Sequence, residues 1–160
     1  MKDWNERLTI VANLAVVAGI VFLAAEVRQN TQAIRAQTRD SITEKQMEYY
    51  GWVATNPELA RVFERGNQLG TSGLDRDSGE AIMYVYALQG IFREYENSYY
   101  QYQEGLFSDE EFEVRLDRWR VGLANKGWQE LWTQSRLGFS HDFRAEIDRI
   151  LTELEGEAES

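Results

Sequence analysis

The sequence predicts an all-α protein: an N-terminal transmembrane helix that continues into a stalk, followed by a small bundle of four to five helices. Three observations support this prediction. Residues 8–25 are almost entirely apolar and carry no charge. Later in the chain, apolar and aromatic residues recur every three or four positions, which is the period of a helix, and no stretch alternates like a half-buried strand. A single proline among 160 residues leaves long helices uninterrupted.

The distribution of charge separates an anchor from an acidic domain. Residues 1–45 hold six Lys and Arg against five Asp and Glu, whereas the rest of the chain holds eleven against twenty-two. Such an acidic domain repels nucleic acid, because binding to nucleic acid depends on neutralising phosphates. We therefore expect a membrane anchor and juxtamembrane stalk at 1–45, an acidic helical domain at 46–156 and a disordered tail at 157–160.

The apolar segment at 8–25 is long enough to cross a bilayer, which takes roughly 20 mostly apolar residues and about 17 at least. A soluble core helix that is apolar on all sides would need protein around every face, and the remaining, mostly amphipathic chain is too short to supply it. A cleaved signal peptide would begin with basic residues and end in a small-x-small site. The first seven residues mix both charges, so we expect an uncleaved anchor.

The expected orientation follows from the Lys and Arg residues beside the span. Four lie within residues 26–45 and two within residues 1–7. Positive charge favours the cytoplasmic side, so we expect a single span in a bacterial inner membrane with the bulk of the chain in the cytoplasm. Trp4 would then lie at the opposite membrane interface, where indole rings are favoured.

Small residues within the span suggest where another helix could pack. Ala15 and Gly19 form a small-x-x-x-small pattern, which lets two helices approach closely. Asn13 could donate or accept a hydrogen bond across such an interface, although alanine-rich spans also produce this spacing by chance. The residues expected at this contact are Ala12, Asn13, Ala15, Ala18 and Gly19.

After the span, neither proline nor glycine occurs before Gly51, so one helix is expected from 3 to 54. Its first turns outside the span are polar. Such a juxtamembrane collar either contacts lipid headgroups and neighbouring helices or is a solvated stalk. The residues of this collar are Arg28, Gln29, Asn30, Gln32 and Arg35.

Caps and breaks divide the acidic domain into helices. Pro57 suits the first turn of a helix that we expect to end at Gly66. Ser108 and Glu111 form a capping box, and residues 126–127 are expected to break the chain between two helices. The helices expected in this domain are 57–66, 80–104, 109–125, 128–136 and 141–154.

The longest helix of this domain has two distinct faces. The apolar face predicts the core and comprises Val85, Leu88, Phe92, Tyr95, Tyr99 and Tyr102. A polar face comprises Gln89, Arg93, Glu96, Asn97 and Tyr100. On the polar face, Arg93 and Glu96 form either an internal ion pair or a recognition surface.

No catalytic, cofactor-binding or metal-binding residues are predicted. Cysteine is absent, so the chain has no thiolate metal site. His141 is the only histidine, so paired Glu-x-x-His motifs are also absent. Nothing in the sequence around His141 places it as a base beside a nucleophile. The glycine-rich stretch at 66–73 lacks the Gly-Lys-[Ser/Thr] ending of a P-loop. We therefore expect no cofactor and no enzymatic activity.

Four stretches carry a resemblance to a known family. They are RQNTQAIRA from Arg28, NPELARVFERG from Asn56, the stretch from Arg93 to Gly105 and the stretch from Phe139 to Arg144. In these the chain resembles an uncharacterised bacterial family of small membrane-anchored helical proteins. The resemblance implies an uncleaved anchor and a helical domain, and it implies no activity.

The hypothesis from the sequence is a non-catalytic membrane protein that acts through protein contacts, as a scaffold, a homo-oligomer or an accessory subunit of a larger complex. Its expected partners are the lipid bilayer and other membrane subunits or copies of itself, but not nucleic acid. One alternative is a sensor or small-ligand binder with an apolar pocket among the tryptophans of 119–143. The other alternative is an enzyme that uses His141 or the polar face.

Overall fold

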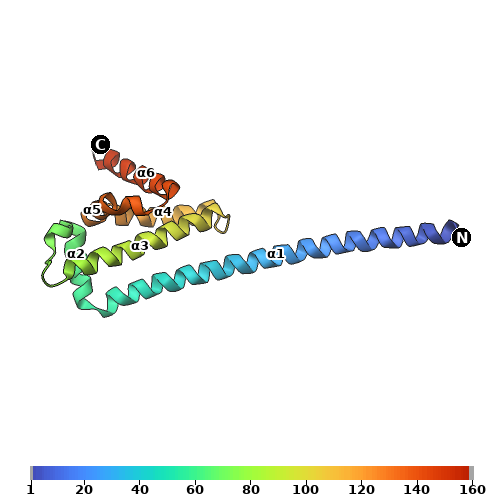
Figure 1. The fold of residues 1–160 in the computed structure, drawn as a ribbon, viewed down its shortest axis with the longest axis horizontal. Coiled ribbons are helices and arrows are strands. Elements are labelled where there is room, and N and C mark those ends of the chain that lie inside the picture. Colours follow the sequence, from blue (N-terminus) through green and yellow to red (C-terminus); the bar gives the residue numbers. More distant parts are fainter. Residues whose placement is uncertain (1, 159–160) are drawn as a thin grey trace. The chain divides into compact units, whose positions relative to one another are not determined.

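The computed structural model describes the backbone of residues 2–158 and their side chains except those of 2, 3 and 6. This part of the chain forms six α-helices and two short 3-10 helices without any strand, so the all-α prediction is confirmed (Figure 1). The elements are α1 (Lys2–Thr55), α2 (Pro57–Leu69), η1 (Thr71–Gly73), α3 (Glu80–Gln103), α4 (Asp109–Leu123), α5 (Lys126–Ser135), η2 (Arg136–Gly138) and α6 (His141–Ala158).

The chain divides into two compact units, Met1–Ser41 and Ile42–Ser160, and α1 contributes to both. In the first unit every described side chain is exposed except Thr38, which is half-buried. The second unit begins at Ile42, whose side chain is only 2% exposed. The division therefore falls four residues before the expected one, because Ile42 already belongs to the core.

The end of α6 differs from the disordered tail expected at 157–160. Helix α6 continues to Ala158, so Glu157 and Ala158 are helical. Residues 159–160 of the expected tail lie outside the described residues.

An aromatic core holds the second unit together. Along α3, Leu88, Phe92 and Tyr95 are buried, while the other three residues of the expected apolar face are partly buried against the core. The ring of Phe92 contacts Trp128 and Trp132, with centroids 5.7 and 5.3 Å apart. Burying each such ring stabilises the fold by a few kcal/mol.

Two glycines expected to mark helix ends are packing positions instead. Gly66 lies inside α2, where an added Cβ would come within 2.5 Å of the Tyr84 ring. Gly127 lies in the first turn of α5, and its added Cβ would be 2.2 Å from the carbonyl oxygen of Gly66. Only residues without a side chain allow α2, α3 and α5 to approach so closely. The end of α2 falls at Leu69, and Gly70 follows with a φ of 76°.

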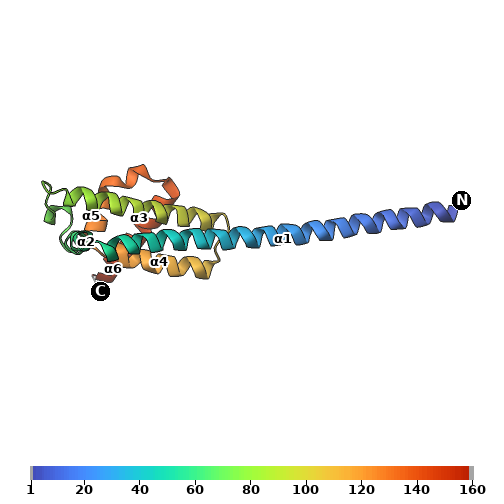
Figure 2. The same ribbon diagram turned by 90° about the horizontal axis from the view of Figure 1, so that it is seen from below.

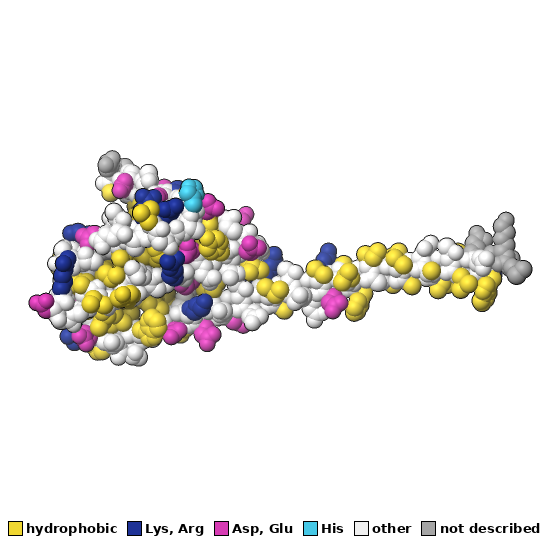
Figure 3. Space-filling model, viewed as in Figure 1, with side chains coloured by type: hydrophobic (Ala, Val, Ile, Leu, Met, Phe, Trp, Pro, Cys, Tyr) yellow, Lys and Arg dark blue, Asp and Glu magenta, His cyan; other side chains and the backbone are white. Residues whose placement is uncertain are grey.

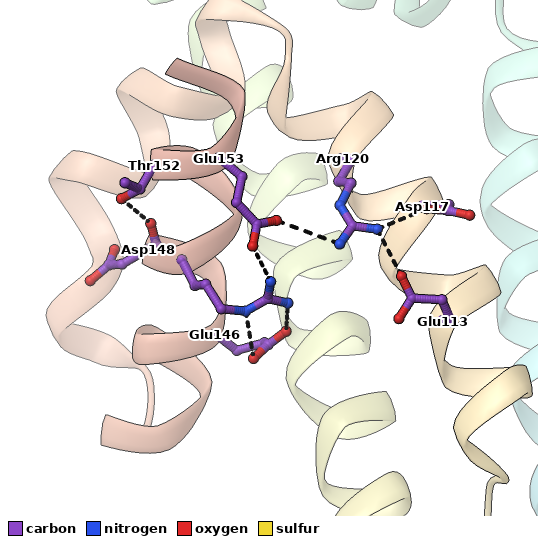
Figure 4. Close-up of polar contacts among 8 residues, drawn as sticks. Glu113, Asp117, Arg120, Glu146, Asp148, Thr152 and Glu153 are labelled. Atoms are coloured by element: carbon purple, nitrogen blue, oxygen red, sulfur yellow. Dashed lines mark hydrogen bonds and ion pairs between the residues drawn. The ribbon is translucent and has the colours of Figure 1, made fainter. Parts of the chain in front are cut away.

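Charged side chains join α4 to α6 on the outside of the bundle (Figure 4). Arg120 contacts Glu113 at 3.1 Å and Asp117 at 2.8 Å on its own helix, and Glu153 of α6 at 3.5 Å. Glu153 also pairs with Arg149. Exposed ion pairs of this kind contribute at most about 1 kcal/mol each, so this cluster orients α6 more than it stabilises the core.

Candidate functional site

A groove in the second unit lies between the end of α1 and helices α3 and α4. Figure 2 shows the last turns of α1 beside these two helices. The groove has a volume of about 770 Å³. On the molecular face in Figure 3, apolar side chains gather over the end of α1 and the facing part of α3, with charged side chains around them.

The sequence of α1 explains why this groove exists. Ile42, Tyr49 and Val53 share one face of the helix; Ile42 is buried, and Tyr49 and Val53 pack against the core. Opposite them, α3 carries Gly90, where an added Cβ would meet nothing within 4 Å. Because Gly90 fills no space, a hollow remains between the two helices at this point.

The floor of the groove is aromatic and rigid. Tyr95 of α3 and Trp119 of α4 stack with ring centroids 4.8 Å apart and planes 17° from parallel. Trp128 lies beside them, with its ring centroid 6.0 Å from that of Tyr95. All three side chains are buried in the core, so the floor is a fixed aromatic surface.

Large apolar side chains also line the rim, where they are exposed. Trp52 is 53% exposed and Tyr86 is 69% exposed, and both line the groove together with Tyr50 and Val121. Single exposed apolar residues are ordinary, but a group of them around one hollow is typical of a binding surface.

Three basic side chains of the groove have no carboxylate within 4.0 Å among the described residues: Lys45, Arg115 and Arg118. The guanidinium of Arg118 lies over the Tyr50 ring, 5.0 Å from its centroid. The guanidinium of Arg115 lies 4.4 Å from the centroid of the Phe107 ring. Burial lowers the pKa of Arg115, because removing a cation from water penalises its charged form.

One carboxyl group of the groove, that of Glu94, is half-buried. Glu94 accepts a hydrogen bond from the Ser98 hydroxyl at 3.0 Å. Burial raises the pKa of Glu94, while Ser98 and the charges of Arg115 and Lys45 oppose that rise. The carboxylate is therefore held by neighbouring donors and cations without a direct ion pair in the described chain.

The polar face predicted on α3 does not form one site. The Arg93 guanidinium donates to Glu96 at 2.7 Å and to the carbonyl oxygen of Gly138 at 3.0 Å. Glu96, only 9% exposed, accepts from the backbone N–H of Ser140 at 2.9 Å. The pair is thus internal, the first of the two alternatives, and ties α3 to the segment before α6.

Arg93 also borders two hollows, each of which it shares with another residue of that face. Asn97 lines the groove, and Gln89 lines a smaller hollow beside Gly138. Tyr100 is exposed.

The residues predicted within and beside the span are all exposed on α1. They include the small-residue face Ala12, Asn13, Ala15, Ala18 and Gly19. In the collar, Arg28, Gln32 and Arg35 share one side of the helix because they are spaced by four and three, whereas Gln29 and Asn30 point elsewhere. Contact of either group with lipid or with another helix stays a prediction.

His141 lies at the start of α6 and is exposed, with its Nδ1 3.1 Å from Asp142 Oδ1. Among the described residues, no group of three His, Cys, Asp or Glu side chains is placed to hold a metal ion. Of the three tryptophans in 119–143, around which an apolar pocket was expected, Trp119 and Trp128 line the groove floor and Trp132 is packed into the core.

No protein-family model, curated protein or solved structure matches this chain. Sequence reasoning missed Lys45, Arg115 and Arg118 because they come from two helices more than sixty positions apart. The signal that could have revealed the groove is the pair of aromatic residues Trp52 and Tyr86, which fit no core face.

Proposed function

We propose that this chain is a single-pass protein of a bacterial inner membrane whose helical domain lies in the cytoplasm and acts by binding, without catalysis. The observation that carries the proposal is the first part of α1. A window of 18 residues there is apolar and long enough to cross a membrane, and none of it is buried.

The energetics favour insertion of this window. Residues 8–25 contain ten Leu, Ile, Val and Phe side chains. Each contributes roughly −0.3 to −0.6 kcal/mol at the centre of a spanning helix. Together they supply about 3 to 6 kcal/mol, against which Asn13 is the only strongly polar side chain. In water, the same residues would stay exposed, as they are on the free helix.

Substitutions within and outside the span test insertion. Two aspartates, Val16→Asp and Phe22→Asp, cost about 2.5 to 3.5 kcal/mol each and offset the whole gain. We expect this variant to leave the membrane pellet, as measured by fractionation of a detergent-free lysate. Ile34→Asp, an exposed apolar position beyond the span, should stay in the pellet. Wild-type protein found in the supernatant as a monodisperse particle would refute the anchor.

The absence of cysteine from the sequence allows a direct test of orientation. A single Ser72→Cys substitution places a thiol on an exposed position of the domain. With the domain in the cytoplasm, an impermeant maleimide should label it only after the inner membrane is opened. Labelling of intact spheroplasts would reverse the proposed orientation.

Protein contacts are the proposed mode of action, as a scaffold, a homo-oligomer or an accessory subunit. Support comes from the exposed small-residue face of the span around Gly19, where an added Cβ would meet nothing within 4 Å. We expect the protein to co-purify with a partner or a second copy in gentle detergent, as measured by native mass spectrometry. A lone monomer would contradict this mode of action.

A second candidate function is favoured by the groove of the second unit. Its volume of about 770 Å³ lies within the roughly 300 to 1,000 Å³ of small-molecule pockets. An anchored domain with such a groove would bind a ligand beside the membrane.

A further inference from the structure

The charges of the groove differ from those of the rest of the chain. Its lining contains four basic and three acidic side chains, whereas the whole chain has 17 basic and 27 acidic residues. One of the four, Arg93, is paired with Glu96. The other three, Lys45, Arg115 and Arg118, have no ion pair within 4.0 Å in the described part of the chain.

We propose that this groove binds a small organic anion with a flat aromatic body, such as an aryl carboxylate or an aryl phosphate. The proposal rests on the second candidate function and is independent of the membrane anchor. The ring of the ligand packs on the stacked pair Tyr95 and Trp119, and its anionic group is held by Arg118 and Lys45 at the rim.

Three properties of the groove favour such a ligand. Lys45 and Arg118 are exposed at the rim and have no carboxylate within 4.0 Å in the described chain, so a bound anion meets two cations that no carboxylate already pairs. Aromatic walls favour a flat ring, because ring pairs gain energy beyond the area that they bury. A guanidinium binds a carboxylate or phosphate through two parallel hydrogen bonds, and Arg118 is already oriented by the Tyr50 ring.

Glu94 limits the affinity without preventing binding. Its carboxyl group accepts from Ser98, and burial raises its pKa. Where it is ionised, its charge lies near Arg115 and Lys45 and weakens their attraction for a second anion. Replacing the carboxylate by an uncharged amide of the same shape should therefore strengthen binding.

Probes that share one ring system and differ in charge test the proposal. We would titrate the full chain, in nanodiscs of zwitterionic phosphatidylcholine, with naphthoate and naphthyl phosphate by isothermal calorimetry, and subtract titrations of empty nanodiscs. Neutral naphthol and cationic naphthylmethylammonium are the matched controls. We expect saturable binding of at least one anion, about tenfold or more tighter than either control. Equal binding of all charge types, or no saturable binding of any anion, overturns the proposal.

Charge variants identify the groups that hold the anion. Arg118→Gln and Lys45→Gln should each weaken binding about tenfold, as expected for loss of a charge-assisted hydrogen bond, while Glu94→Gln should tighten it. The control Arg61→Gln removes an exposed cation of α2 that does not line the groove and should leave the affinity unchanged. Equal losses in Arg61→Gln and Arg118→Gln would show that only net charge matters and would overturn the site.

A steric variant tests the position of the site without weakening the fold. Gly90→Leu adds a side chain where a Cβ meets nothing within 4 Å, and it replaces a poor helix former with a good one. We expect it to abolish binding while the thermal midpoint stays equal or rises. Gly156→Leu makes the same change at an open position of α6 outside the groove and should bind normally. Full affinity in Gly90→Leu overturns the proposal.

The same variant distinguishes a small ligand from a protein occupant. If a second copy or a partner helix fills the groove, no probe displaces it and Gly90→Leu changes the assembly mass measured from nanodiscs. That result would overturn the ligand proposal and leave the membrane anchor intact.

Discussion

The side-chain oxygen of Asn67 accepts two hydrogen bonds from buried donors. The Tyr84 hydroxyl donates to it at 2.8 Å and the Trp128 indole N–H at 3.1 Å. Both donors belong to buried residues of other helices, so this single atom links α2, α3 and α5. The variant Asn67→Leu removes the acceptor and leaves both donors without a partner.

The size of the effect follows from these two bonds. Leaving a buried donor unsatisfied costs about 1 to 3 kcal/mol, so Asn67→Leu should lower the free energy of unfolding by about 2 to 6 kcal/mol. Natural domains are stable by only about 5 to 15 kcal/mol, so the loss is a large fraction of the total. In a Tyr84→Phe background one donor is already gone, and the same substitution should cost about half as much.

Urea unfolding of the full chain in a mild detergent, followed by tryptophan fluorescence, measures both quantities. The matched control is Gln68→Leu, which places the same side chain on the exposed neighbouring position and should change stability by less than about 0.5 kcal/mol. The reasoning is refuted if Asn67→Leu is as stable as this control. If Asn67→Leu lowered the free energy of unfolding equally in the wild-type and Tyr84→Phe backgrounds, the effect could not come from two separate donors.

Three further predictions use the same unfolding measurement. Gly127→Ala should destabilise the domain by about 1 to 3 kcal/mol, because its Cβ would clash with the carbonyl oxygen of Gly66; stability equal to wild type would contradict the close approach of α2 and α5. Glu96→Ala should cost about 1 to 3 kcal/mol, because it leaves the N–H of Ser140 without its acceptor; an unchanged midpoint would show that the bond contributes nothing. Burial raises the pKa of Glu94, so the native state binds the proton more tightly than the unfolded state, and stability falls as pH rises from the ordinary to the raised pKa. Glu94→Gln should remove this loss of stability and should therefore be more stable than wild type at about pH 7 but not at about pH 4. If the difference in stability between the variant and wild type were the same at both pH values, the charge of Glu94 would not be its cause.

Local sequence signals predicted the helices well where a cap or a periodic face fixes the backbone. The capping box of Ser108 and Glu111 opens α4 as expected, with both reciprocal hydrogen bonds present. The expected break at 126–127 and the expected end at Gly66 were wrong. A glycine that ends a helix and one that admits a neighbouring ring look the same in sequence, and only the position of Tyr84 separates them.

The candidate groove was less predictable than the helices around it. Its floor residue Tyr95 was expected in the core, since its spacing marks a buried face. Its basic residues Lys45, Arg115 and Arg118 come from α1 and α4, and their meeting depends on how these helices pack. Nothing local to Lys45 or Arg118 indicates that the two line the same groove.

By itself the sequence determined the helical class and the exposed apolar length of α1, because these depend on local periodicity and on the lack of charge in residues 8–25. It also fixed the acidic character of the domain, which is a matter of composition. Only the tertiary structure decided that Arg93 and Glu96 are an internal pair and that three cations without a carboxylate within 4.0 Å in the described chain line a groove with an aromatic floor. Such arrangements depend on distances between residues far apart in the chain, which are set by side chains packing across several helices at once.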